Sequence, residues 1–124
     1  MVPNETFSHT ARLHSPAEFS RVFEQRRSAA SNGLVLYACP NAGGPSRLGM
    51  SVSRRVGGAV VRNRWKRRLR EAFRRVRSRL PAGNDFVVVV RTATVPAGAA
   101  GARQVEEALI ALATRVVGRP GYRH

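Results

Sequence analysis

Hydrophobic residues recur at helical spacing early in the chain, near its middle and near its end. In the first of these stretches, Phe19, Val22 and Phe23 fall on one face of a helix. Residues 15–18 supply a serine suited to the N-cap, a proline for the first helical position and the glutamate of a capping box. The pattern predicts a first helix that starts after Ser15 and ends near residues 26–28.

Short apolar runs between turn residues predict the strands. Such runs cover residues 34–39, 47–53 and 85–91, and Asn32-Gly33 marks a turn before the first of them. The run at 85–91 is unbroken, which predicts a central strand covered on both faces. The pattern leaves room for a further strand in the 40s.

A long helix is predicted over residues 59–80, and a closing helix over residues 102–117. At about 100° per residue, one stripe of the long helix is apolar and comprises Val61, Trp65, Leu69, Ala72, Val76 and Leu80. The polar residues opposite the stripe are Asn63, Arg67, Arg70 and Arg74, with Arg62 and Arg68 flanking it. The predicted order of elements is α-β-β-(β)-α-β-α. This order predicts a small fold of the α/β class, in which helices and strands are arranged as in α+β proteins. We expect one domain over residues 1–124, with a core at about 12–117 and flexible tails.

The charge of the chain points to a polyanionic partner. Its 124 residues carry 22 basic residues against 7 acidic ones, a formal net charge of +15. The densest run, residues 62–75, lies on the predicted long helix, where like charges repel one another. This balance favours nucleic acid, with an anionic membrane surface as the weaker alternative. Every basic residue except Lys66 is arginine, which fits either planar recognition of phosphate or a compositional bias.

Other features narrow the class of protein. The single cysteine, Cys39, excludes an internal disulfide and a cysteine-cluster metal site, and its apolar surroundings predict a small buried hydrophobe. The N-terminus has no pattern of a secretion signal, and no apolar stretch approaches the roughly 20 residues of a membrane span. We therefore expect a cytoplasmic chain without a membrane partner.

The residues for self-sufficient catalysis are sparse. The only aspartate is Asp85, at the edge of a predicted strand, and Glu71 is expected to pair with Arg67 or Arg75. The histidines fall in the tails, at positions 9, 14 and 124. No Ser-His-Asp order, Walker loop or zinc spacing is present. We assign no catalytic residue and no metal ligand, and an enzyme that works with its own side chains is not expected.

Two features, one on the long helix and one just before it, each allow two interpretations. Trp65 lies in the apolar stripe, which favours a core anchor over a base-stacking platform. Gly57-Gly58 before the helix either binds phosphate at the helix N-terminus or forms a plain connection. The arginine-rich face is expected to meet phosphates. The chain shows no helix-turn-helix, zinc-finger or zipper pattern, and RNA recognised by its shape fits the charge equally well.

At this level of detail the chain resembles a known family. The matching segments are Phe19-x-x-Val22-Phe23, Leu34-Val35-Leu36-Tyr37, the run from Arg47 to Gly57 with Ala59-Val60, Arg62-Asn63-Arg64-x-Lys66-Arg67-x-x-Arg70-Glu71, and Asp85 to Arg91. In order and spacing they resemble the bacterial ribonuclease P protein component over roughly residues 12–117. Arg54 and Arg55 stand where many members carry lysines, and the basic N-terminal tail common in the family is weak.

The resemblance implies the protein subunit of a ribonucleoprotein endonuclease that removes the 5′ leader from precursor tRNA. It implies that a large RNA supplies catalysis and binds most of the Mg²⁺, with one protein copy per RNA. It also implies a two-layer sandwich with a left-handed βαβ crossover around the basic helix, whereas right-handed crossovers are the general rule.

The resemblance also implies where RNA binds. The expected RNA-binding residues, which we call the basic set, are Arg54, Arg55, Arg62, Asn63, Arg64, Lys66, Arg67, Arg68 and Arg70. A leader cleft is expected to be lined by Phe19, Phe23 and Tyr37, since aromatic rings stack on unpaired bases. The spacing of Phe19 and Phe23 is also that of plain core residues, and the two interpretations overlap if the cleft wall is the edge of the core.

Two other functions fit the charge. A structural RNA-binding module, such as a ribosomal protein, would bind RNA without enhancing cleavage. A DNA-packing protein would prefer duplex DNA to structured RNA and show a steep salt dependence on any duplex.

Overall fold

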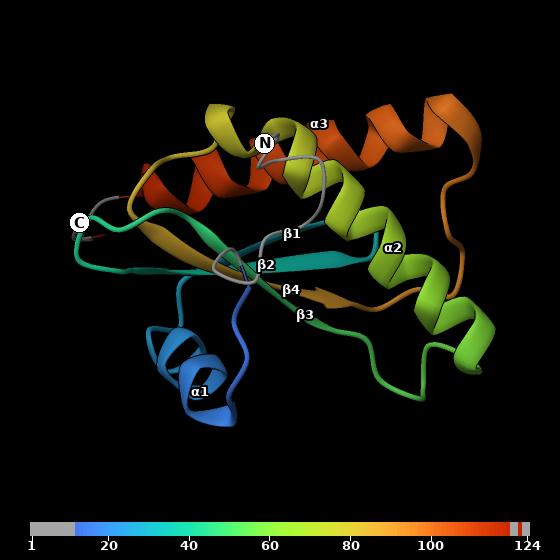
Figure 1. Cartoon of the computed structure of the whole chain (residues 1–124), viewed down its shortest axis with the longest axis horizontal. Helices are drawn as coiled ribbons and strands as arrows, with labels where there is room; N and C mark the ends of the chain where they lie inside the picture. The colour runs from blue at the N-terminus through green and yellow to red at the C-terminus, as the bar shows by residue number, and fades with distance from the viewer. Residues whose placement is uncertain (1–11, 120–121, 123–124) are drawn as a thin grey trace, which may run out of the picture.

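Three α-helices and four strands build the molecule (Figure 1). The computed structural model describes residues 12–119 and residue 122. The elements are α1 Pro16–Glu24, β1 Ser28–Ser31, β2 Leu34–Pro40, β3 Arg47–Ser51, α2 Ala59–Val76, the 3-10 helix η2 Arg77–Arg79, β4 Asn84–Val90 and α3 Gly98–Val117. The two predicted tails lie largely outside the described residues, as do His9 and His124.

The four strands form one mixed sheet in the order β1-β2-β4-β3. β4 is central, antiparallel to β2 and parallel to β3, and Val88 faces Leu36 on one side and Met50 on the other. Six of its seven residues are buried, because helices cover both faces of the sheet. The prediction of a central strand from its unbroken apolar run is confirmed.

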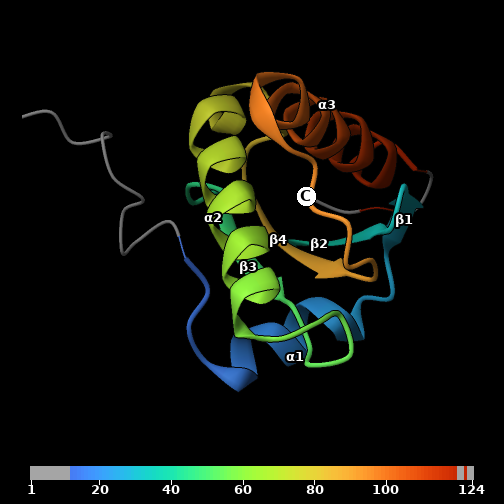
Figure 2. The same ribbon diagram turned by 90° about the vertical axis from the view of Figure 1, so that its right-hand side faces the viewer.

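Helices lie on both faces of this sheet. α2 and α3 pack side by side on one face and form with the sheet the predicted two-layer sandwich, while α1 packs against β2 and β4 on the other face (Figures 1 and 2). The connection from β3 through α2 to β4 joins two parallel neighbours. Seen from the helix side with both strands pointing up, β4 lies to the left of β3 (Figure 2). The crossover is therefore left-handed, as the resemblance implied.

The main core fills the space between the sheet and the α2–α3 layer. Its largest fully buried side chains include Trp65, Phe73 and Phe86. Trp65 is 1% exposed, and its Nε1 donates a hydrogen bond to the Thr92 carbonyl at 2.8 Å, which confirms the core anchor. A smaller cluster under α1 contains Cys39, and burial raises the pKa of its thiol, in line with the predicted buried hydrophobe.

The additional strand lies before residue 34 and not in the 40s. Asn32 and Gly33 both have positive φ, 52° and 81°, which is the geometry of a tight hairpin turn. This turn pairs β1 with β2. The small residues of β1 carry no apolar signal, so the sequence pattern did not show this strand.

The helix ends also differ from prediction. α2 stops at Val76 and continues as η2, and Leu80 is already extended before Pro81, as the residue preceding a proline favours. α3 begins at Gly98, before the predicted residue 102, because its first turns are made of glycine and alanine, which leave no apolar stripe to read. α1 ends at Glu24, slightly before the predicted end.

Candidate nucleic-acid interface

The capping box predicted for α1 is present and fixes the start of this helix. Glu18 donates its backbone N–H to Ser15 Oγ at 3.2 Å, and Glu18 Oε1 accepts from the backbone N–H groups of His14 and Ser15 at 2.7 and 3.0 Å. These backbone donors, with Arg47 nearby, lower the pKa of Glu18 to about 2. Glu18 therefore ties the incoming chain to the helix that carries Phe19 and Phe23.

All nine residues of the basic set reach the surface. The exposed members are Arg54, Arg55, Asn63, Arg64 and Arg67, and the partly buried members are Arg62, Lys66, Arg68 and Arg70. None of them forms an ion pair with any other residue of the described part of the chain. The eight basic residues of the set, on α2 and the turn before it, therefore carry positive charge that no ion pair of the described residues neutralises.

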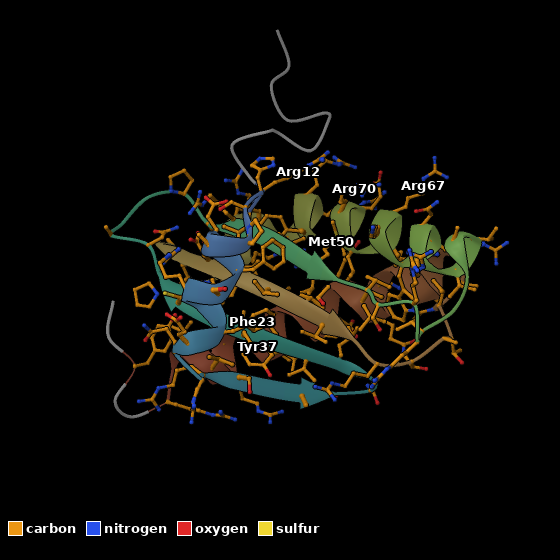
Figure 3. All side chains as sticks on the ribbon, turned by 90° about the horizontal axis from the view of Figure 1, so that it is seen from below. Arg12, Phe23, Tyr37, Met50, Arg67 and Arg70 are labelled. Atoms are coloured by element: carbon orange, nitrogen blue, oxygen red, sulfur yellow. The ribbon has the colours of Figure 1, made fainter. Side chains whose placement is uncertain are left out.

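Arg70 is partly buried on α2 and lies near Arg12 of the segment before α1. Figure 3 shows Arg12, Arg70 and Arg67 on the same side of the molecule. Burial, followed by the like charges of Arg12 and Arg67, lowers the pKa of Arg70. The backbone of Leu13 donates to the Leu48 carbonyl at 3.1 Å, which holds this segment beside β3. An anion at this point would relieve the repulsion among the three guanidinium groups.

Arg62 has a second role that the sequence did not show. Its Nε donates to the Gly57 carbonyl at 3.2 Å, so it closes the turn that leads into α2. The N-cap residue Gly58 makes no side-chain cap, and the first turn of α2 has no acidic residue. Part of the Arg62 side chain is therefore engaged in local structure, while the Arg64 side chain makes no hydrogen bond within the described residues.

The predicted partner of Glu71 is wrong. Glu71 Oε1 accepts from Arg74 Nη2 at 3.0 Å, an i,i+3 pair, in place of Arg67 or Arg75. Arg75 instead lies 3.9 Å from Glu106 Oε2 of α3. Residues three and four apart are both neighbours on a helix surface. Which arginine pairs with Glu71 therefore depends on side-chain rotamers that the sequence does not specify.

The three aromatic residues predicted for the leader cleft lie together between α1 and the sheet. The Phe23 and Tyr37 rings meet edge to face at 4.9 Å and 87°, and Phe19 is 6.5 Å from Phe23 (Figure 3). All three side chains are partly buried, and between them Val22 is completely buried. They pack on the small core cluster and stay partly accessible, so they serve as core residues, and their role in a leader cleft stays a prediction. We call Phe19, Phe23 and Tyr37 the aromatic patch.

A buried charge network under α1 escaped the sequence analysis. Asp85 is fully buried in β4 and not at an exposed strand edge. Its carboxylate accepts from Arg47 Nε and Nη2 at 2.9 and 2.7 Å, from Asn41 Nδ2 at 3.0 Å, and from Arg21. Arg47 also donates to Glu18 Oε2 at 3.0 Å, and its hydrogen bonds to Asp85 raise its pKa. These partners are 38 to 64 residues from Asp85 in sequence, too far for a local pattern to reveal.

A cavity of about 320 Å³ lies at the carboxyl end of β4. Arg55 of the turn before α2 and Arg91, which follows β4, both line it. The sequence pattern includes Arg91 in the predicted strand and gave it no site role; a signal that could have indicated it is its position at the end of the apolar run, since the ends of parallel strands often carry functional residues. Among residues 12–119 and 122, no group of three or more His, Cys, Asp or Glu is placed to hold a metal ion. No helix in the same part of the chain is long and apolar enough to cross a membrane.

Comparison with known proteins adds a family and solved relatives. A family model described as Ribonuclease P matches residues 7–117. The ribonuclease P protein component of Chloroflexus aurantiacus is 48% identical over 84 residues, which cover 68% of this chain and 62% of that protein. The corresponding protein of Brevibacillus brevis is 44% identical over 81 residues, covering 64% of each. The chain thus spans less than two thirds of the length of these curated relatives.

Two solved structures extend the likeness to nearly the whole fold. The RNase P protein from Thermotoga maritima matches with a TM-score of 0.71 at 32% identity, over 86% of this chain and 98% of that one. The Staphylococcus aureus RNase P protein, solved at 2.0 Å, matches with a TM-score of 0.68 at 29% identity, over 92% of this chain and 98% of that one.

Proposed function

Because this chain belongs to the ribonuclease P protein family, we propose that it is the protein subunit of bacterial ribonuclease P. In this role it binds a catalytic RNA and the 5′ leader of precursor tRNA, and it promotes endonucleolytic removal of that leader. One domain over residues 1–124 carries the role, with one protein copy per RNA.

The observation that carries the proposal is the uncompensated charge of the basic set. Its members line one helix and the preceding turn, and none is neutralised by a carboxylate of the described residues. Guanidinium groups donate planar, paired hydrogen bonds that match phosphate oxygens. An RNA backbone along α2 would supply the missing negative charge, with affinity that falls steeply as salt rises.

The aromatic patch supports the second half of the proposal. Its residues belong to α1 and β2 and pack around the small core cluster under α1. This helix lies on the opposite face of the sheet from α2 and α3 (Figure 1), and Figure 3 shows Phe23 beside Tyr37. A partly exposed ring stacks on any base, so such a patch suits a single-stranded leader of variable sequence. The Asp85 network holds α1 to the sheet and thereby sets the position of Phe19 and Phe23.

The Mg²⁺ of this reaction is proposed to be bound mainly by the RNA. In the described residues the buried carboxylate of Asp85 is already engaged by two arginines and an asparagine. Such a donor set does not fit a divalent cation, which needs several free oxygen ligands. We therefore derive no catalytic step through a protein-bound metal, and the chain's own residues bind and position the RNA.

Single-turnover cleavage of precursor tRNA tests the proposal. The cognate catalytic RNA is assayed at limiting Mg²⁺ with and without the protein, and the protein is also assayed alone. A large rise in 5′-leader removal, with no cutting by the protein alone, is the expected result. RNA binding without any rise would replace the proposal with a structural RNA-binding module.

A further inference from the structure

A second cavity lies on the flank of α2 that faces α3, away from the aromatic patch. It measures about 340 Å³, and its lining from α2 is Arg64, Arg67, Arg68 and Glu71. The other wall is the segment 95–98, which leads from the sheet to the start of α3 (Figure 2). We call this cavity the α2–α3 pocket.

The α2 wall of the pocket is strongly positive. Arg64, Arg67 and Arg68 make no ion pair within the part of the chain that the structure describes. The single carboxylate of the lining, Glu71, accepts a hydrogen bond from Arg74, which does not line the pocket. The pocket thus has three guanidinium groups and one carboxylate that is already paired, which suits a phosphate.

The opposite wall is apolar and held in place. Val95 packs against the main core, and Pro96 and Ala97 continue the wall. Gly101 of α3 lies directly beneath, since a Cβ added there would be 2.4 Å from the Pro96 carbonyl carbon. The segment therefore rests on the α3 backbone at a distance that only glycine permits, and the pocket wall is formed before any ligand arrives.

A nucleic-acid base can bind between an apolar wall and a wall of guanidinium groups. Unpaired bases stack on apolar and arginine surfaces, while the attached phosphate pairs with arginine. The volume falls at the lower end of the range for small-molecule sites, roughly 300–1,000 Å³, which suits a single nucleotide.

We propose that the α2–α3 pocket is a nucleotide site that takes one unstacked nucleotide, with its phosphate, from the RNA partner. This inference rests on the proposed function and adds to it a contact distinct from the leader. The leader lies on the α1 side of the sheet, and the new site lies beyond α2 on the other side. The protein would then hold RNA on both faces of its sheet.

The affinity of the full-length protein for its catalytic RNA tests the site. Ala97→Glu puts a carboxylate beside the three arginines, and Ala97→Gln is the neutral control of the same size. We expect Ala97→Glu to bind at least tenfold more weakly than Ala97→Gln at the same salt concentration. Ala111→Glu, an exposed change of the same charge elsewhere on α3, should stay within threefold of wild type. Equal affinity of the Glu and Gln variants at position 97 would overturn the inference.

Crosslinking locates the nucleotide independently. Ala97→Cys carries a benzophenone, and the buried native Cys39 is not expected to react. Irradiation with the catalytic RNA and precursor tRNA should join residue 97 to one or two adjacent nucleotides. Crosslinks scattered over many nucleotides, or none, would overturn a single-nucleotide site.

A third test probes the apolar wall without changing charge. Gly101→Ala should displace Pro96 and weaken RNA binding at least threefold, while thermal unfolding shows a folded protein. Unchanged affinity would count against the wall. If the wild-type protein stimulates leader removal but these variants bind the catalytic RNA as tightly as wild type, the pocket inference alone fails. If wild type does not stimulate removal, the proposed function fails first.

Discussion

Arg47 donates two hydrogen bonds to the fully buried carboxylate of Asp85, from Nε at 2.9 Å and from Nη2 at 2.7 Å. This pair joins β3 to the central strand β4, and Arg21 brings α1 to the same carboxylate. The helix that carries two of the three aromatic side chains is therefore fixed by charge as well as by apolar packing. A buried carboxylate with this many donors is costly to disturb, because its partners lose their counter-ion.

Asp85→Asn should lower the free energy of unfolding by about 3 kcal/mol, the lower end of the range for breaking a buried pair, because both arginines are partly exposed. Urea unfolding followed by circular dichroism measures the loss. Glu71→Gln is the control, since its pair with Arg74 is on the surface and should contribute about 0.5 kcal/mol or less. A loss below about 1 kcal/mol for Asp85→Asn would show that the network contributes little.

Glu18 gives the fold a dependence on acid pH. Its pKa falls from an ordinary 4.5 to about 2 in the folded protein, chiefly through the backbone N–H groups of His14 and Ser15. A lowered folded-state pKa contributes stability that is fully present above pH 4.5 and is lost as the pH falls towards 2. Wild type should therefore be more stable than Glu18→Gln at pH 6, and the difference should shrink between pH 4.5 and 2. A constant difference across that range would contradict the role assigned to Glu18.

The helices and the central strand could be predicted because each is encoded locally, and the positive charge of α2 is visible as a run of arginines. The capping box before Phe19 and the unbroken run 85–91 are signals within a few residues of one another. β1 could not be predicted, since Ala29 and Ala30 take their strand conformation from pairing with Leu36 and Val35. The same limit applies to Asp85, whose four donors come from three distant segments.

The left-handed crossover has a different origin. Sequence patterning alone favours a right-handed connection between parallel strands, and only the family resemblance implied the opposite hand. The site residues divide in the same way. The arginines of α2 are visible as a charge run, whereas the pocket wall at 95–98 has no pattern of its own and takes its place from contact with Gly101.

Alanine variants at Arg62 and Arg64 should distinguish a role in RNA binding from a role in folding. Arg62→Ala removes the bond to the Gly57 carbonyl and should cost about 1 kcal/mol of stability. Arg64→Ala should change stability by less than about 0.5 kcal/mol, because the Arg64 side chain makes no hydrogen bond or ion pair within the described residues. Both variants should weaken RNA binding, and removal of one arginine from the phosphate backbone should lower the salt slope by about one. Paired measurements of unfolding and of binding against salt test this, and wild-type affinity for Arg64→Ala at low Mg²⁺ would argue against its place in the RNA interface.

Gly49 controls the position of Phe19. A Cβ at this residue of β3 would lie 2.7 Å from Phe19 Cζ, so Gly49→Ala should push the ring away and cost about 1–3 kcal/mol. Leader affinity should fall with it, while affinity for a tRNA without leader should not. Combining Gly49→Ala with Phe19→Leu makes room for the methyl group, so the two stability losses should be less than additive. Strict additivity would mean that the contact does not constrain the ring.

The uncompensated charge of α2 gives salt two opposite effects. In the free protein, added ions screen the repulsion among arginines that have no carboxylate partner in the described residues, so the melting temperature should rise. In the complex, the same ions compete with the arginines for phosphate, so assembly should weaken. Under the proposed function, the buffer that best preserves the isolated protein would therefore be a poor one for assembly with RNA, and the RNA would act as the stabilising counter-ion of this helix.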